Sequence, residues 1–142
     1  MKFDAIVSLL PRSKQKIYCA ATPISAGEAA EICTELEQLD LCEYITGGRE
    51  GFYLIRTDGD SMEGEIRNGD WLITDTNQPP NNGEIIVASV NGDYLVKDYK
   101  PLNNGLMLVP KNEKYESRVI TAKDDFKTFG VVRGIIRLFK KN

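Results

Sequence analysis

The sequence predicts a mainly-β domain that follows an N-terminal arm and one short helix. From residue 52 onward, short runs rich in β-branched, aliphatic and aromatic residues alternate with turn residues, a pattern that is typical of strands. Asn91-Gly92 lies between two such runs and indicates a hairpin, because both central positions of a type I′ turn need positive φ. The expected strands cover residues 52–56, 71–75, 84–90, 93–99, 106–109 and 129–139.

The N-terminal third has a different pattern. Residues 1–26 show no convincing period or caps and are expected to be a mobile arm. Ser25 and Glu28 have the spacing of a capping box, and apolar residues follow at intervals of three and four, so a short amphipathic helix is expected over residues 27–41. The predicted organisation is therefore an arm at 1–26, a linker with a short helix at 27–49, and a domain at 50–142.

Composition excludes several classes of function. The chain has 142 residues and a formal net charge of −3, so it lacks the basic excess of most nucleic-acid-binding domains. It contains no histidine, which rules out His-dependent catalytic triads and His metal ligands. Cys19, Cys33 and Cys42 match neither zinc-site nor redox-pair spacing, so reduced thiols, no metal and no cofactor are expected. Because no apolar run approaches a membrane span, the protein is expected to be cytoplasmic.

Ser61 is the first candidate for a chemical role. It lies in Gly59-Asp60-Ser61-Met62, directly after an expected strand and ahead of residues 63–66, which have the character of one helical turn. A serine at that position has backbone amides nearby that can stabilise an oxyanion. The simpler alternative is that Ser61 only caps the turn.

Lys97 is the second candidate. Strand alternation places it on the same face as Leu95 and Tyr99, so we expect it to be partly buried. Burial lowers the pKa of a lysine, and a neutral lysine can act as the base for a serine nucleophile. The alternative is an exposed strand lysine whose ammonium group extends into water.

The region that contains these two residues resembles the peptidase domain of the LexA and UmuD type. The resemblance is carried by Gly59-Asp60-Ser61-Met62, Gly69-Asp70, Asp93-Tyr94-Leu95-Val96-Lys97 and Leu108-Val109-Pro110-Lys111-Asn112, in this order, and continues to Phe129-Gly130-Val131-Val132. It implies a compact, twisted, barrel-like β-sheet in which Ser61 and Lys97 form a catalytic dyad.

The same resemblance implies that the protein cleaves itself ahead of the peptidase domain. Ile24-Ser25-Ala26-Gly27-Glu28 resembles the cleavage segment of the family, which predicts a cut between Ala26 and Gly27. Cleavage between Cys19 and Ala20 is the second possibility, and the capping box described above is the structural alternative for this segment.

The arm ahead of Gly27 is too short for a helix-turn-helix, so the resemblance favours a UmuD-like protein over a repressor, without sequence-specific DNA binding. It implies cleavage stimulated by RecA filaments on single-stranded DNA. It also implies a homodimeric product that binds an error-prone DNA polymerase. Two alternatives remain at this point: a LexA-like regulator of a phage or mobile element whose DNA-binding half is a separate chain, and a signal-peptidase-like enzyme.

Overall fold

The computed structural model describes residues 2–9, 17–20 and 36–139. It divides into two compact units, one formed by residues 1–8 with 51–142 and the other by residues 9–50. Each unit is described by itself below. The expected capping box and the Ala26-Gly27 bond lie outside the described residues.

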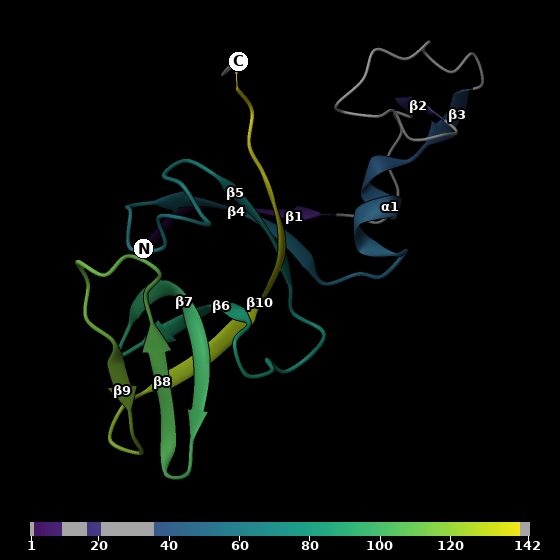
Figure 1. Ribbon diagram of the computed structural model, residues 1–142. Coiled ribbons are helices and arrows are strands. Elements are labelled where there is room, and N and C mark those ends of the chain that lie inside the picture. The colour runs from purple at the N-terminus through teal and green to yellow at the C-terminus, as the bar shows by residue number, and fades with distance from the viewer. Residues whose placement is uncertain (1, 10–16, 21–35, 140–142) are drawn as a thin grey trace. The chain divides into compact units, whose positions relative to one another are not determined.

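The larger unit is built on one eight-stranded sheet (Figure 1). Its strands lie in the order β1-β4-β5-β10-β6-β7-β8-β9, and all pairings from β4 to β9 are antiparallel. The bounds are β1 Lys2–Leu9, β4 Phe52–Asp58, β5 Trp71–Asp75, β6 Ile85–Val90, β7 Asp93–Leu102, β8 Gly105–Val109, β9 Arg118–Ile120 and β10 Phe126–Ile136. The predicted mainly-β fold class is confirmed.

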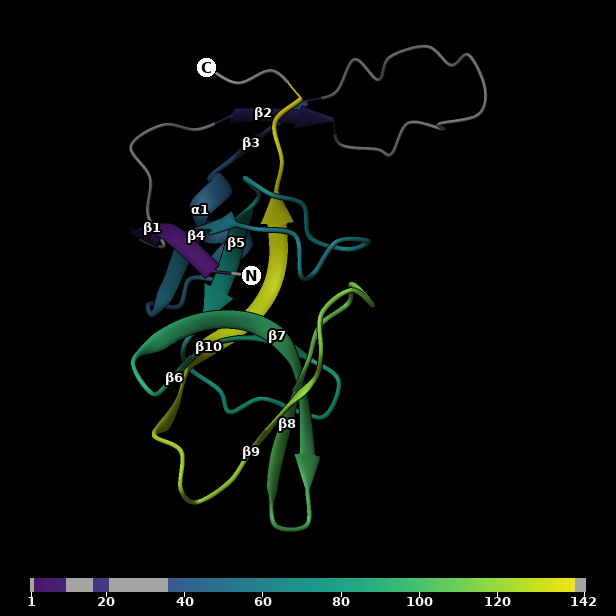
Figure 2. The same cartoon turned by 90° about the vertical axis from the view of Figure 1, so that its left-hand side faces the viewer.

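The last strand, β10, connects the two halves of this sheet. It pairs with β6 through its first part and with β5 through its second part. Its register shifts between Thr128 and Gly130 and again between Val132 and Gly134. Such irregularities bend a strand and increase its twist, and β10 is visibly curved in Figure 2.

Two buried clusters hold the sheet together. One contains Ile55, Met62, Ile66, Leu72, Val87 and Val96, and the other contains Ile86, Ala88, Val90, Leu108, Ile120 and Val131. Neighbouring residues of one strand, such as Ile86 and Val87, belong to different clusters because side chains alternate along a strand. The sheet therefore has apolar packing on both faces.

The six expected strands are all present, with ends that differ by a few residues. The Asn91-Gly92 hairpin is confirmed: Asn91 has a φ of 51° and Gly92 a φ of 88°, and Val90 pairs with Asp93 across the turn. Two further strands of this unit, β1 and β9, were not expected. The sequence of residues 2–9 has no clear alternation, and its neighbour β4 lies far along the chain, so local pattern did not reveal β1.

The smaller unit contains a two-stranded antiparallel sheet and the helix α1. The strands are β2, Ile17–Ala20, and β3, Leu36–Leu39, and α1 covers Leu41–Thr46. The helix expected to end at residue 41 is therefore wrong for residues 36–39, where pairing with β2 overrides the helical spacing. The true helix begins after Asp40, whose carboxylate accepts a hydrogen bond from the Glu43 amide at 3.1 Å and caps it.

Candidate active site

Ser61 lies in the turn that follows β4. The next residue, Met62, and Ile66 are both buried in the first apolar cluster. Two backbone hydrogen bonds close the turn, from Glu63 N to Asp60 O at 3.0 Å and from Ile66 N to Met62 O at 3.0 Å. The expected helical turn is thus present as a hydrogen-bonded turn, and its apolar anchors fix the position of Ser61.

Lys97 is presented by β7. It lies opposite Ile86 of β6, and Leu95 and Tyr99 on either side of it pack against the cluster that contains Ile86. This matches the face predicted from strand alternation. The neighbouring Val96 points into the other cluster, the one that also holds Met62.

These two elements bring the candidate residues together. The Lys97 Nζ donates a hydrogen bond to the Ser61 Oγ at 2.6 Å. Ser61 is only 2% exposed, and Lys97 is partly buried. A lysine amine at this distance from a serine hydroxyl has the geometry that is required of a base acting on a nucleophile.

Burial also sets the protonation of this pair. Removal of water from around the Lys97 amine lowers its pKa below the ordinary lysine value, because the low-dielectric surroundings disfavour the charged form. The neutral amine, which can accept a proton from Ser61, is therefore more populated than in an exposed lysine.

The loop after β8 supplies two neighbours of the pair that sequence reasoning did not identify as part of the site. Asn112 donates its backbone N–H to Ser61 O at 2.9 Å, and its side-chain amide donates to Asp60 O at 3.1 Å. Tyr115 donates its hydroxyl to Asp60 Oδ1, and its ring centroid lies 5.7 Å from Lys97 Nζ. Asn112 is the last residue of the motif Leu108-Val109-Pro110-Lys111-Asn112 that carries the resemblance, and no local signal distinguishes Tyr115 from the other tyrosines.

The bond expected to be cleaved, Ala26-Gly27, lies outside the described residues. Cys19, next to the alternative bond, forms part of β2 and pairs with Glu37 of β3.

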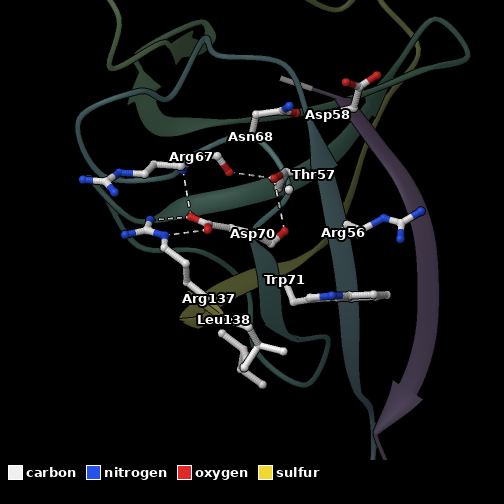
Figure 3. Close-up of a pocket in the computed structure, with 11 residues that line it drawn as sticks. Arg56, Thr57, Asp58, Arg67, Asn68, Asp70, Trp71, Arg137 and Leu138 are labelled. Atoms are coloured by element: carbon white, nitrogen blue, oxygen red, sulfur yellow. Dashed lines mark hydrogen bonds and ion pairs between the residues drawn. The ribbon is translucent and has the colours of Figure 1, made fainter. Parts of the chain in front are cut away.

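A second polar feature of the larger unit is separate from the pair. It is a pocket of about 500 Å³ between β4, the loop before β5 and the segment after β10, and neither Ser61 nor Lys97 lines it (Figure 3). On one side, Arg137 Nε and Nη2 bind Asp70 Oδ1 and Oδ2 at 2.7 and 2.6 Å. Burial alone raises the pKa of the Asp70 carboxyl, but the bonds from Arg137 and from the Arg67 amide outweigh this and lower it. This ion pair ties the end of β10 to the loop before β5.

Within the described ranges, no group of three or more Cys, Asp or Glu side chains is placed to hold a metal ion. None of the helices described is long and apolar enough to cross a membrane.

Comparison with known proteins assigns the family. A model of the Peptidase S24-like family matches residues 18–133, which include both Ser61 and Lys97. The chain belongs to the Peptidase S24-like family. The predicted resemblance to LexA- and UmuD-type peptidases is thereby confirmed.

Individual relatives of this S24-like chain fall into two groups. It is 35% identical to LexA repressor 2 of Pseudomonas syringae pv. tomato over 86 residues, which is 60% of this chain and 43% of that protein. It is 31% identical to the LexA repressor of Desulfatibacillum aliphaticivorans over 121 residues, 83% of this chain and 57% of the repressor. Protein ImpA of Salmonella typhimurium is 30% identical over 118 residues, 82% of this chain and 77% of ImpA. The chain thus spans about half the length of these LexA repressors and a larger share of ImpA.

Proposed function

We propose that this chain is a self-cleaving serine peptidase in which Ser61 is the nucleophile and Lys97 is its general base. The observation that carries the proposal is the 2.6 Å hydrogen bond between Lys97 Nζ and Ser61 Oγ, made by a lysine whose pKa is lowered by burial. Membership of the S24-like family supports it. A serine that only caps a turn does not need a partly buried amine on its hydroxyl.

The reaction proceeds in two halves. Neutral Lys97 accepts the proton of Ser61 Oγ as the oxygen attacks the carbonyl carbon of Ala26. A bond forms between Oγ and that carbon, the Ala26-Gly27 bond breaks, and the proton on Lys97 passes to the departing amine of Gly27. Water then attacks the ester, with Lys97 again as base, which frees Ser61 and leaves a carboxylate on Ala26. Backbone amides of the turn around Ser61 stabilise the oxyanion.

We infer a role in the bacterial SOS response to DNA damage, in the manner of UmuD. The similarity to ImpA, which covers most of both chains, supports this role. On this proposal, RecA filaments on single-stranded DNA stimulate cleavage in the cytoplasm. The shortened product is a homodimer that serves an error-prone DNA polymerase in translesion synthesis.

A second candidate is a LexA-like regulator of a phage or mobile element that relies on another chain for DNA binding. The identity to LexA repressors, 35% over 86 residues in one case, favours it. A neighbouring polymerase gene supports the UmuD-like role, whereas a neighbouring gene for a separate helix-turn-helix protein supports the regulator.

The direct test of the peptidase is intact-mass measurement after incubation at alkaline pH, with Ser61→Ala as the control. We expect wild type to yield fragments 1–26 and 27–142, and Ser61→Ala to remain whole. A wild-type chain that stays intact both at alkaline pH and with RecA filaments would overturn the proposal.

A further inference from the structure

The loop after β8 is hydrogen-bonded to the turn that follows β4 and carries Ser61, which we call the nucleophile turn. Asn112 binds two successive carbonyls of that turn, those of Asp60 and Ser61. The loop is also closed on itself, since Asn112 Oδ1 accepts the Lys114 amide at 3.1 Å and Asn112 O accepts the Tyr115 amide at 3.1 Å. Tyr115 is therefore held in a defined position relative to Ser61.

From this position Tyr115 contacts two ionisable groups beside the nucleophile, the Asp60 carboxylate and the Lys97 amine. Its hydroxyl donates to Asp60 Oδ1, and its ring lies against the Lys97 amine. The side chain is 45% exposed, so apolar burial does not by itself account for its placement.

A carboxylate close to Lys97, such as that of Asp60, would disfavour the neutral form of the lysine. Asp60 directly precedes Ser61, whose hydroxyl accepts a hydrogen bond from Lys97, and its carboxylate binds the tyrosine whose ring lies against the amine. A carboxylate within about 4–6 Å of an amine stabilises the ammonium form. Lys97 in that form has no lone pair to accept the serine proton. Nevertheless, among the ion pairs of the described residues, none involves Lys97.

We propose that Tyr115 is a positioning residue that holds the Asp60 carboxylate away from Lys97, so that the amine stays available to Ser61. This inference rests on the proposed roles of Ser61 and Lys97. The tyrosine acts through Asp60 and takes no part in bond making or breaking.

The other groups that face Lys97 or lie next to it do not take over the role proposed for Tyr115. Across the sheet, Lys97 faces the uncharged Ile86 of β6. The adjacent Asp98 binds Lys111 at 2.8 Å, and Lys111 also lies 3.4 Å from Glu65. The charge of Glu63 in the nucleophile turn acts on Tyr115, where it contributes to raising the tyrosine pKa.

The hydrogen bond from Tyr115 to Asp60 requires that the tyrosine hydroxyl keeps its proton. The hydrogen bond to Asp60 is the main cause that raises the pKa of Tyr115 above its ordinary value, with Asp60 and Glu63 charge effects in the same direction. These effects favour the protonated tyrosine, which is the form that can donate to Asp60.

The decisive variant is Tyr115→Phe, which keeps the ring over Lys97 and removes only the hydroxyl. With Asp60 released, the lysine should hold its proton to higher pH. We expect self-cleavage to slow about tenfold well below the midpoint of its pH profile, with an unchanged rate at the alkaline plateau. The double variant Asp60→Asn/Tyr115→Phe has no carboxylate to release and should regain the wild-type midpoint. Tyr94→Phe, an exposed tyrosine on the same strand as Lys97, is the matched control and should leave the profile unchanged.

A second measurement separates this inference from the peptidase proposal. In the Ser61→Ala background, which cannot cleave, the Lys97 side-chain NMR shifts can be followed through a pH titration. We expect Tyr115→Phe to raise the lysine pKa by about one unit and the added Asp60→Asn to reverse the change. An unchanged or lowered Lys97 pKa in Tyr115→Phe, or an increase that persists in the double variant, would overturn the proposed role of Tyr115. This holds whether or not the wild type cleaves itself.

Discussion

Lys97 Nζ lies 2.6 Å from Ser61 Oγ, although the two residues are 36 positions apart in the sequence. Their neighbours explain the meeting, since Met62 and Val96 are buried in one apolar cluster. The hydrogen bond is thus supported by the core rather than by flexible surface side chains. A pair held in this way is preorganised, which favours proton transfer.

The first prediction concerns the pair itself. Ser61→Ala should abolish self-cleavage because the nucleophile is gone, and Lys97→Ala should slow it by about 10²- to 10⁴-fold because general-base catalysis is lost. The double variant should be no slower than Ser61→Ala, since the two residues act as one unit. Lys100→Ala, an exposed lysine of the same strand, is the control and should cleave normally. Cleavage that survives in Ser61→Ala would show that another nucleophile operates.

The second prediction concerns the pH dependence of cleavage. Only the neutral amine can accept the serine proton, so the rate should rise with pH until Lys97 has lost its proton. Because burial lowers the pKa of Lys97, the midpoint should lie below the ordinary lysine value of about 10.4. Lys97→Arg should stay inactive throughout, since a guanidinium does not release its proton in this range. A flat wild-type profile, or normal cleavage by the arginine variant, would exclude Lys97 as the base.

The third prediction follows from the same lowered pKa and concerns stability. Above the unfolded lysine value of about 10.4, both states hold a neutral amine and no penalty exists. As pH falls through that value, the unfolded chain gains a proton before the folded chain does, so folding loses stability until the folded lysine is also protonated. Lys97→Met should therefore be more stable than wild type in urea unfolding near neutral pH, and this advantage should shrink toward pH 10. An advantage that is constant with pH would point to packing instead of charge.

Much of the fold could be predicted because its signals are local. The Asn91-Gly92 turn needs only the φ preferences of two residues, and the shared face of Leu95, Lys97 and Tyr99 needs only strand alternation. The same local logic went wrong at residues 36–39, where pairing with β2 gives a strand in place of the expected helix.

The site itself depends on contacts between distant parts of the chain. Composition and spacing nominated Ser61 and Lys97 separately, and only the family resemblance predicted that they meet. Tyr115 was missed because its role comes from contacts with Asp60 and Lys97, which only the folded loop after β8 creates.

The fourth prediction concerns the bond that is cut. A narrow cleft that accepts an extended segment with small residues should reject bulk and charge, so Gly27→Glu should block processing while the Ser61-Lys97 pair remains intact. To show that the pair is unaffected, a separate peptide that spans the wild-type bond can be supplied and its cleavage measured. N-terminal sequencing of the wild-type product should begin at Gly27. A product that begins at Ala20 would instead identify the bond after Cys19 as the substrate.

The last prediction concerns the Asp70-Arg137 ion pair beside the pocket of Figure 3. Asp70 is 2% exposed, so Arg137→Ala leaves a buried carboxylate that retains only its bond from the Arg67 amide, at 2.8 Å. We expect a loss in the free energy of unfolding near pH 7 that exceeds that of a surface pair, because the buried Asp70 charge loses its ion-pair partner. Arg118→Ala is the control, because Arg118 only reaches Asp124 at 4.0 Å on the surface, and it should cost less than about 0.5 kcal/mol.

The pKa of Asp70 is lowered in the folded state, so the stabilisation by this pair is present above the unfolded aspartate value of about 3.9 and is lost as pH falls through the folded value. The difference between wild type and Arg137→Ala in urea unfolding should accordingly narrow on acidification below about pH 4. An equal difference at pH 7 and in acid would show that Arg137 stabilises the end of β10 by packing rather than by its charge.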